Sequence, residues 1–213
     1  MFSAALIDLD GTITEPYIGI TNGVMYAYEK LGMDIPERSA LRSFIGPPLL
    51  DEFMRRGLTE ERAKQAVRLY REYYGEKGLF ENRLIDGAEE FLARLKNAGV
   101  RICLATSKPE QFSVRILERF GIAQYFDFIG AAAMDGSRSS KLSVIRYVLD
   151  GTGAKPEDCV MVGDRMHDII GAHQAGMKCI AVLVGYGSRE EFAEYHADYV
   201  AEDLDAAANI ITE

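Results

Sequence analysis

The sequence predicts an α/β fold in which helices cover a parallel sheet, with a small all-helical segment inserted after the first strand. Two observations predict this fold. Short apolar runs rich in β-branched residues alternate with helical patterns, which is typical of parallel strands joined by right-handed crossovers. One stretch, from about residue 17 to residue 79, breaks this alternation with several helical patterns and no convincing strand.

Six short apolar runs are the expected strands of the sheet. In chain order they are Ala4–Ile7, Val100–Ala105, Phe126–Ile129, Cys159–Val162, Cys179–Val184 and, more weakly, Tyr199–Val200. Between most of these runs, apolar residues recur at spacings of three and four and a glycine follows the last turn. That pattern marks an amphipathic helix and its C-terminal cap. The clearest such helices are Gly87–Ala98, Pro109–Phe120 and Leu142–Leu149, the last ending near Gly151.

The insert contains four expected helices. In order, they are one capped by Thr21, one that follows Pro36, one over Leu49–Arg56, and one that is capped by Thr59 and runs to Gly75. Ordinary crossover helices are the alternative, but connections between a strand and the next helix are usually short. We therefore expect a core formed by residues 1–15 and 81–213 and a helical cap formed by residues 16–80.

Bulk properties exclude several classes of protein. The formal net charge is −9 over 213 residues without a block of lysine or arginine, so a nucleic-acid polymer is not an expected partner. No apolar run is long enough to cross a bilayer, and the first strand leaves no room for a signal peptide. We therefore expect a cytoplasmic protein with no membrane partner. The three cysteines are far apart and odd in number, which favours small buried hydrophobes over a zinc site or disulfides.

Two acidic clusters follow expected strands. Asp8 and Asp10 end the first strand, and Gly11 lets the chain turn close to a ligand. Asp164 and Asp168 follow a later strand and are expected to share a helical face. Asp8, Asp10 and Asp164 together offer oxygen ligands without cysteine or histidine. Because such a set suits Mg²⁺, the sequence predicts a magnesium site at this edge of the sheet.

A second group of polar residues is suited to phosphate. Thr106 and Ser107 lie between an expected strand and a helix, where hydroxyls and backbone N–H groups bind phosphate oxygens. Capping of that helix is the alternative role for either hydroxyl. Lys141 opens another helix, a position that the helix dipole disfavours for a cation, which indicates a functional ammonium group; a solvated surface lysine is the alternative.

Four segments in order resemble the motifs of the haloacid dehalogenase superfamily: DLDGT at 8–12, LATSK at 104–108, GSRSSK at 136–141 and GDRMHD at 163–168. The resemblance covers nearly the whole chain. It implies a Rossmann-like three-layer core and identifies the helical insert with the superfamily's C1 cap. The last two segments, together with FIGPPL at 44–49 and GYGS at 185–188, look most like the 5′-nucleotidase-like subgroup near phosphoglycolate phosphatases.

This resemblance also implies roles for the residues. Asp8 is similar to the nucleophile that forms a phospho-aspartate, and Asp10 to the general acid/base, whose backbone carbonyl also ligates the metal. Asp164 matches a metal ligand, and Asp168 a ligand or its support. Thr106 matches the hydroxyl that binds the transferring phosphoryl group, and Lys141 the lysine that shields nucleophile and phosphate. Gly11 and Ser107, from the residue pattern above, complete the expected phosphate site. Lys108 and His167 lie within the motifs, and their roles stay open.

In the insert, Tyr17, Phe44 and Gly46 are candidates for contact with the substrate. The related sugar-phosphate mutases place an arginine in the 44–49 loop, and this chain has no basic residue between Arg42 and Arg55. The expected enzyme is therefore a Mg²⁺-dependent phosphatase of small phosphomonoesters, with 5′-nucleoside monophosphates as the first candidate and phosphoglycolate as the alternative. A mutase and a non-catalytic regulatory module are more remote alternatives. The oligomeric state stays open.

Overall fold

The computed structural model describes every residue from Met1 to Glu213, and the chain divides into two compact units. One unit comprises Met1–Glu15 and Leu84–Glu213, and the other comprises Pro16–Arg83. The chain passes between them at two short strands that pair with each other, β2 (Thr14–Glu15) and β3 (Arg83–Leu84). No helix of the chain is long and apolar enough to cross a membrane.

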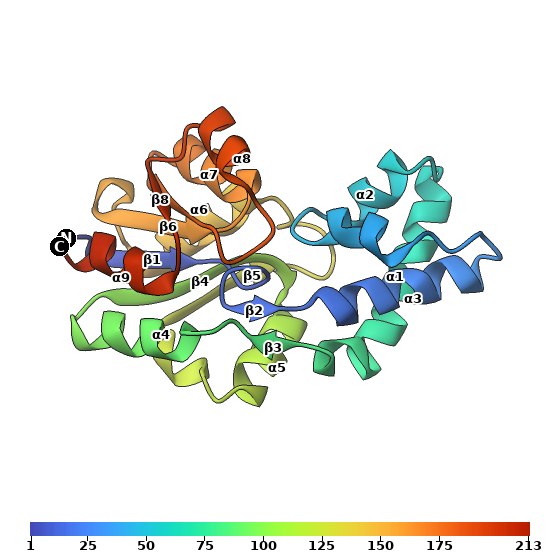
Figure 1. Cartoon of the computed structure of the whole chain (residues 1–213), viewed down its shortest axis with the longest axis horizontal. Coiled ribbons are helices and arrows are strands. Elements are labelled where there is room, and N and C mark those ends of the chain that lie inside the picture. The colour runs from blue at the N-terminus through green and yellow to red at the C-terminus, as the bar shows by residue number, and fades with distance from the viewer. The chain divides into compact units, whose positions relative to one another are not determined.

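The first unit is built on a six-stranded parallel sheet with the order β5-β4-β1-β6-β7-β8 (Figure 1). All six expected strands are present, so the α/β prediction is confirmed. The strands are β1 (Ala4–Ile7), β4 (Arg101–Pro109), β5 (Phe128–Ala132), β6 (Cys159–Gly163), β7 (Lys178–Val182) and β8 (Tyr199–Ala201). The order runs outward in both directions from β1, so the carboxyl ends of β1, β4 and β6 meet where the topology switches direction. Ligands bind at such switch points in open α/β sheets.

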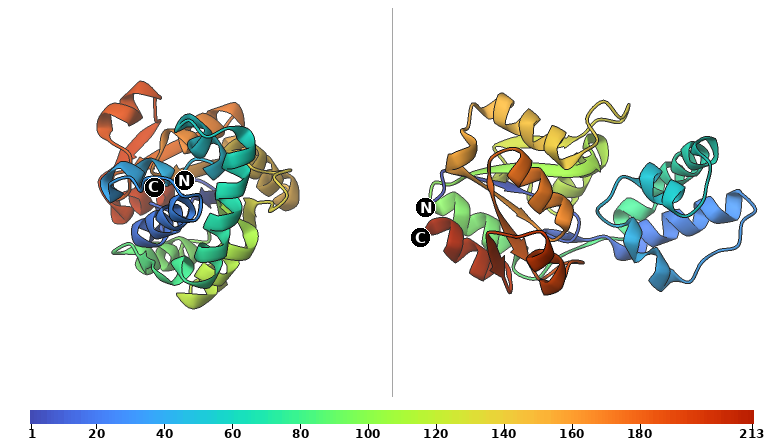
Figure 2. Two further views of the ribbon diagram at one scale, coloured as in Figure 1. Left: turned by 90° about the vertical axis from the view of Figure 1, so that its right-hand side faces the viewer. Right: turned by 90° about the horizontal axis from the view of Figure 1, so that it is seen from above.

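Helices cover both faces of this sheet, which gives the three layers of a Rossmann-like fold (Figure 1). On one face lie α6 (Lys141–Thr152), α7 (Met166–Gln174) and α8 (Arg189–Glu194). On the other lie α4 (Ala88–Asn97), α5 (Glu110–Arg119) and α9 (Leu204–Thr212). Short 3₁₀ turns complete the connections at η3 (Ala123–Tyr125) and η4 (Pro156–Asp158). Figure 2 shows the same layers from two further directions.

The core of this unit is formed by apolar residues that alternate along the strands and recur along the helices. Leu6, Cys103 and Met161 from adjacent strands pack with Val144 and Ile169 from the covering helices, and all five are buried. The three cysteines are buried and unpaired, as the sequence predicted. Burial raises the pKa of the Cys103 thiol to about 12, so it is inert at neutral pH.

Several expected boundaries in this unit differ from the structure; the strand expected at Phe126–Ile129, for example, is Phe128–Ala132. The helix expected to end near Gly151 runs on to Thr152 and ends at Gly153, which has φ 67°. Gly151 therefore lies inside the helix, and close packing accounts for the glycine, since a β-carbon there would lie 2.5 Å from the Phe128 ring. Strand β4 runs on through residues expected to form a loop and ends only at Pro109.

The second unit is all helical. It contains α1 (Tyr17–Lys30), the 3₁₀ helix η1 (Arg38–Phe44), α2 (Leu49–Arg55), α3 (Glu60–Glu76) and η2 (Gly78–Phe80). Thr59 caps α3 as expected, since its hydroxyl accepts a hydrogen bond from the Arg62 N–H at 3.4 Å. The expected cap at Thr21 is wrong. Helix α1 begins four residues earlier, and the Thr21 hydroxyl donates to the Tyr17 carbonyl at 2.6 Å inside it.

Residues 81–83 also belong to the helical unit. The Glu81 carboxylate accepts hydrogen bonds from the Asn22 amide at 2.9 Å and from the Tyr73 hydroxyl at 3.1 Å. The Glu81 carbonyl accepts from the Gly19 N–H at 3.1 Å. These contacts tie the end of the insert back to α1 and α3, and the unit therefore ends at Arg83.

Candidate active site

The candidate catalytic residues of the core gather at the carboxyl ends of the central strands. Asp8 directly follows β1, and its N–H donates to the Val162 carbonyl of β6 at 2.9 Å. Thr106 lies near the end of β4, and Asp164 directly follows β6. Parallel register between these neighbouring strands brings residues that are up to 156 positions apart in the chain to one edge of the sheet.

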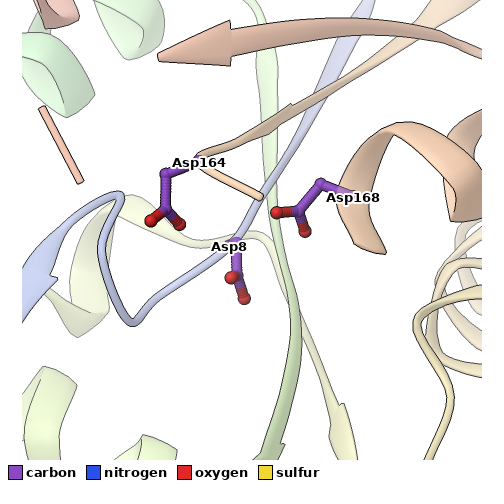
Figure 3. Close-up of side chains that lie close together, drawn as sticks. All are labelled: Asp8, Asp164 and Asp168. Carbon is purple, nitrogen blue, oxygen red and sulfur yellow. The ribbon is translucent and has the colours of Figure 1, made fainter. Parts of the chain in front are cut away.

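Three carboxylates form a compact cluster at this edge. One oxygen from each of Asp8, Asp164 and Asp168 lies within 4.8 Å of the others, and all three residues are buried (Figure 3). Buried carboxylates this close repel one another unless a cation lies among them. Hard oxygen donors with no nitrogen or sulfur ligand fit Mg²⁺, so the residues present suit that ion. The side chain of Asp10 is not part of the cluster, so a contribution from Asp10 would come through its backbone carbonyl, as the family resemblance implies.

Asp164 and Asp168 do not share a helical face, and that expectation was wrong. Helix α7 begins only at Met166, so Asp164 lies before it, while Asp168 is its third residue. The Asp168 carboxylate accepts a hydrogen bond from the Arg165 N–H at 3.1 Å and thereby caps the helix. The two carboxylates still meet because the chain turns sharply between the strand end and the first turn of the helix.

The Asp164 carboxylate is held by groups from two loops. The Thr12 hydroxyl donates to its Oδ1 at 3.3 Å, and the Tyr186 N–H donates to its Oδ2 at 2.8 Å. A β-carbon on Gly11 or on Gly185 would lie 2.2 Å from the same Oδ2. Gly11 also has φ 87°, a conformation that favours glycine. Both loops therefore need glycine to approach the carboxylate closely.

Lys141 supplies a buried positive charge beside the cluster. Its Nζ lies 2.8 Å from Oδ1 of Asp8 and 2.7 Å from Oδ1 of Asp168, and it donates a hydrogen bond to the Ala105 carbonyl at 2.8 Å. Lys141 is the first residue of α6, as expected, and its side chain runs into the site instead of into solvent. The attraction of two carboxylates thus offsets the repulsion between this ammonium group and the positive end of the helix dipole.

One ammonium group does not compensate the whole cluster. Burial raises the pKa of Asp164 well above its usual value, and the charges of Asp168 and Asp8 raise it further. Burial also raises the pKa of Asp168 to about 6, although Lys141 opposes that rise. The site therefore favours uptake of either protons or a divalent cation at neutral pH.

Asp10 forms an ion pair with a different lysine, Lys108. The Nζ of Lys108 lies 2.6 Å from the Oδ2 of Asp10, and both side chains are nearly buried. Burial raises the pKa of Asp10 and the nearby Lys108 lowers it, with a net rise. This direction agrees with the pKa near neutrality that a general acid/base requires. The sequence left the role of Lys108 open, because residues 106–108 were expected to form a loop, whereas strand β4 continues through them with a register shift between Thr106 and Pro109.

The two hydroxyl residues of the expected phosphate cradle differ from each other. Thr106 is buried, and its hydroxyl accepts a hydrogen bond from the Lys108 N–H at 3.2 Å, so it does not cap α5. The residue at the N-cap of α5 is Pro109, which was expected in the first turn. Ser107 is partly exposed within β4, between Thr106 and Lys108.

The three candidates for substrate contact lie in the helical unit, and Phe44 is not available for stacking on a ligand. It is 1% exposed, and its ring packs 4.8 Å from the ring of Phe53. The Arg56 guanidinium lies 5.0 Å from the same ring. Tyr17 is the first residue of α1 and is half-buried, and Gly46 has φ 104° and is partly exposed. Of the two aromatic candidates, only Tyr17 remains.

Comparison with known proteins identifies the family. Residues 5–182 match the family described as haloacid dehalogenase-like hydrolase. The chain belongs to this family. This haloacid dehalogenase-like hydrolase is 42% identical to a 5′-nucleotidase from Pseudomonas aeruginosa over 207 residues, which cover 97% of the chain and 94% of the relative. It also superposes on a structure described as a predicted phosphatase from Clostridium acetobutylicum with a TM-score of 0.96 and 40% identity, over 99% and 98% of the two chains.

Relatives with other names also align with this hydrolase. The tyrosine-protein kinase PtkA of Mycobacterium tuberculosis is 41% identical over 189 residues, which cover 89% of the chain but only 64% of that kinase. A phosphoglycolate phosphatase from Thiobacillus denitrificans is 27% identical over 217 residues, which cover 98% of the chain and 95% of the relative. The family and the α/β fold predicted from the sequence are therefore confirmed, while the named relatives differ in substrate.

Proposed function

We propose that this hydrolase is a Mg²⁺-dependent phosphatase that forms a phospho-aspartate on Asp8 and acts best on 5′-nucleoside monophosphates. Hydrolysis of phosphate monoesters is the reaction of the phosphatases that it matches over nearly their whole length. The proposal of a metal ion rests on the buried cluster of Asp8, Asp164 and Asp168, in which one ammonium group faces three carboxylates. A small-molecule phosphate ester is the partner that such a site needs, and we propose that the enzyme acts in the cytoplasm.

The proposed reaction has two steps. A carboxylate oxygen of Asp8 attacks phosphorus in line, the bond to the leaving oxygen breaks, and Asp10 gives that oxygen its proton. Asp10 then takes a proton from water as the water attacks the phosphorus of the acyl phosphate, which releases inorganic phosphate and frees Asp8. One residue serves both steps because it returns to its starting protonation state. A bound Mg²⁺ would neutralise charge on the phosphoryl oxygens.

The other residues of the site would prepare these steps without changing protonation. Lys141 holds Asp8 in place and offsets negative charge as the phosphate dianion approaches. The Thr106 hydroxyl lies on the next strand, where it would bind a phosphoryl oxygen together with Ser107 and the backbone at Gly11. Asp164 and Asp168, which are fixed by backbone N–H groups, would hold the metal.

A nucleotide substrate is favoured over phosphoglycolate by two observations: the identity of 42% to a 5′-nucleotidase against 27% to a phosphoglycolate phosphatase, and the charges of the helical unit. A carboxylate-bearing leaving group needs a cationic partner, and residues 43 to 54 contain none. The two arginines that follow pair with a carboxylate of this unit, and the Arg55 side chain is 62% exposed. Arg55 and Arg56 both contact the buried carboxylate of Glu52, and Arg56 also lies over Phe44. These contacts support a leaving group that carries no negative charge near this loop.

The test measures phosphate release from AMP and from phosphoglycolate in excess Mg²⁺ and compares kcat/KM. We expect AMP to be the better substrate. If the Tyr17 ring stacks on the base, Tyr17→Ala lowers kcat/KM for AMP by roughly ten- to a hundredfold and leaves phosphoglycolate unchanged. Asp8→Asn serves as the control for contaminating phosphatases. A higher kcat/KM for phosphoglycolate would overturn the nucleotide assignment in favour of that alternative. Transfer of label from ATP to a tyrosine-containing peptide, without phosphate release, would instead indicate a kinase.

A further inference from the structure

Lys108 is a second buried lysine of the site, and none of the roles implied by the family motifs belongs to it. Its Nζ lies 2.6 Å from Oδ2 of Asp10, with side-chain exposures of 5% and 12% for the lysine and the aspartate. Lys141, the motif lysine, contacts Asp8 and Asp168 instead. Lys141 therefore pairs with Asp8 and Asp168, whereas Lys108 pairs with Asp10, the residue proposed to transfer protons.

Stability alone does not account for this pair. A buried ion pair pays a large desolvation cost, and replacing one with apolar side chains often leaves stability unchanged or higher. Lys108 lies on β4, next to β1 in the sheet, and at the same edge as the other site residues. A lysine that reaches an aspartate at this edge is therefore better explained by the chemistry of Asp10 than by the packing of the core.

Lys108 also makes the strongest contact that fixes the Asp10 carboxyl group. The other oxygen, Oδ1, accepts only a long contact of 3.5 Å from the Thr14 hydroxyl. The backbone around Asp10 is set by the following turn, in which the Gly11 N–H donates to the Thr14 carbonyl at 2.7 Å. With the backbone fixed by that turn and Oδ2 fixed by Lys108, the orientation of the carboxyl plane is determined.

We propose that Lys108 is a positioning residue that holds the Asp10 carboxyl group in the orientation needed to protonate the leaving oxygen and, later, to deprotonate the attacking water. This inference rests on the proposed phosphatase function. The proton still moves between Asp10 and the leaving oxygen, and Lys108 exchanges no proton and forms no bond with the substrate. Removal of Lys108 should therefore cost most where a proton must be delivered.

The experiment compares two substrates of nearly the same shape. Phenyl phosphate has a basic leaving oxygen that needs a proton, whereas para-nitrophenyl phosphate has a much better leaving group that does not. For Lys108→Met, we expect kcat/KM for phenyl phosphate to fall about a hundredfold, the usual size of a general-acid contribution. For para-nitrophenyl phosphate, kcat/KM should fall less than about fivefold, because this ratio reports only steps up to formation of the phospho-enzyme.

A second readout follows the water step. With para-nitrophenyl phosphate, Lys108→Met should release one equivalent of nitrophenolate in a burst and then turn over slowly, because a misplaced Asp10 activates water poorly. The double variant Lys108→Met with Asp10→Ala should lose no more activity on phenyl phosphate than Asp10→Ala alone, since the lysine acts through the aspartate. The matched control is Lys96→Met. Lys96 pairs with Asp127 at the same 2.6 Å, but on the surface and away from the site.

Each outcome decides the matter. Equal losses on the two substrates, additive losses in the double variant, or no loss at all would overturn the positioning role. If Lys108→Met does not fold, as judged by circular dichroism and thermal melting, Lys108→Gln is tested on the same substrates with the same expectations. A wild-type enzyme that releases neither phenol would contradict the proposed function itself, and the role of Lys108 would fall with it.

Discussion

The Nζ of Lys141 lies 2.8 Å from Oδ1 of Asp8, at the point where the first strand of the sheet ends. The same ammonium group lies 2.7 Å from Asp168, so one cation links the proposed nucleophile to a proposed metal ligand. Because Lys141 comes from the start of α6 and Asp8 from the end of β1, the pair forms only when the helix packs on the sheet. The contact thus ties the integrity of the core to the orientation of the nucleophile.

Asp8→Asn should abolish turnover and leave the fold intact. The substitution keeps the shape of the side chain but removes the attacking carboxylate, and losing an essential nucleophile costs more than about 10⁴-fold in kcat. Phosphate release from AMP in excess Mg²⁺ measures the loss, and circular dichroism checks the fold. Activity within about tenfold of the wild type would show that Asp8 is not the nucleophile.

Removal of the metal should abolish the phosphatase activity. Excess EDTA is expected to stop phosphate release, and added Mg²⁺ is expected to restore it. Ca²⁺ should inhibit, because it takes more ligands at longer distances and would draw both oxygens of Asp8 into coordination, which prevents in-line attack. The measurement is the initial rate across a titration of each ion. Full activity in excess chelator would contradict the proposed metal site.

The metal-free protein should lose stability as the pH rises from about 4 through about 6, the range between the unfolded and the folded pKa of Asp168. Burial raises the pKa of Asp168 to about 6 and raises that of Asp164 well above its usual value, while in the unfolded chain both lie near 4. A carboxyl group with a raised folded pKa binds protons more tightly when folded, so its contribution to stability declines between the unfolded and the folded pKa. The pKa of Lys141 is also raised, but its contribution is constant in this window, because the unfolded pKa of lysine lies far above it.

Thermal melting at several pH values, with and without Mg²⁺, checks this expectation. At pH 7.5, Mg²⁺ at a hundredfold excess over its Kd should add about 2.7 kcal/mol, or roughly 5–10 °C in Tm. Asp164→Asn removes one of the repelling charges, so its metal-free melting temperature should vary less with pH and should respond weakly to Mg²⁺. Identical pH and Mg²⁺ responses in this variant and the wild type would contradict the electrostatic account of the cluster.

Phe44→Ala should destabilise the helical unit instead of affecting substrate recognition directly. The ring is 1% exposed and packs against Phe53, and truncating a buried phenylalanine typically costs about 3–5 kcal/mol. Urea unfolding followed by circular dichroism measures the shift in the midpoint. Tyr17→Ala, at a half-buried position, is the comparison and should shift the midpoint less. A raised KM for AMP with unchanged stability in Phe44→Ala would restore the stacking role that the sequence suggested.

The sequence predicted the fold class and the core of the site for a physical reason. Buried parallel strands require continuous apolar runs, and carboxylates placed directly after such runs, at Asp8 and Asp164, must meet at one edge of the sheet. The position of Lys141 at a helix start was also readable, because a cation there is unfavourable unless something offsets it. These inferences depend only on local pattern and on the rule that parallel strands share an edge.

Tertiary packing alone decided the remaining features, because they depend on which side chains meet across the chain. Phe44 is the last residue of η1 and was expected near the substrate, but its ring packs against Phe53 and Arg56. Nothing in the local sequence distinguishes Lys108 from the other lysines. It meets Asp10, 98 positions away in the chain, only because β4 pairs with β1 in the sheet. The sequence determined where charge and apolar surface lie along the chain, whereas the partner of each buried charge was fixed by the close packing of distant elements, which local pattern does not encode.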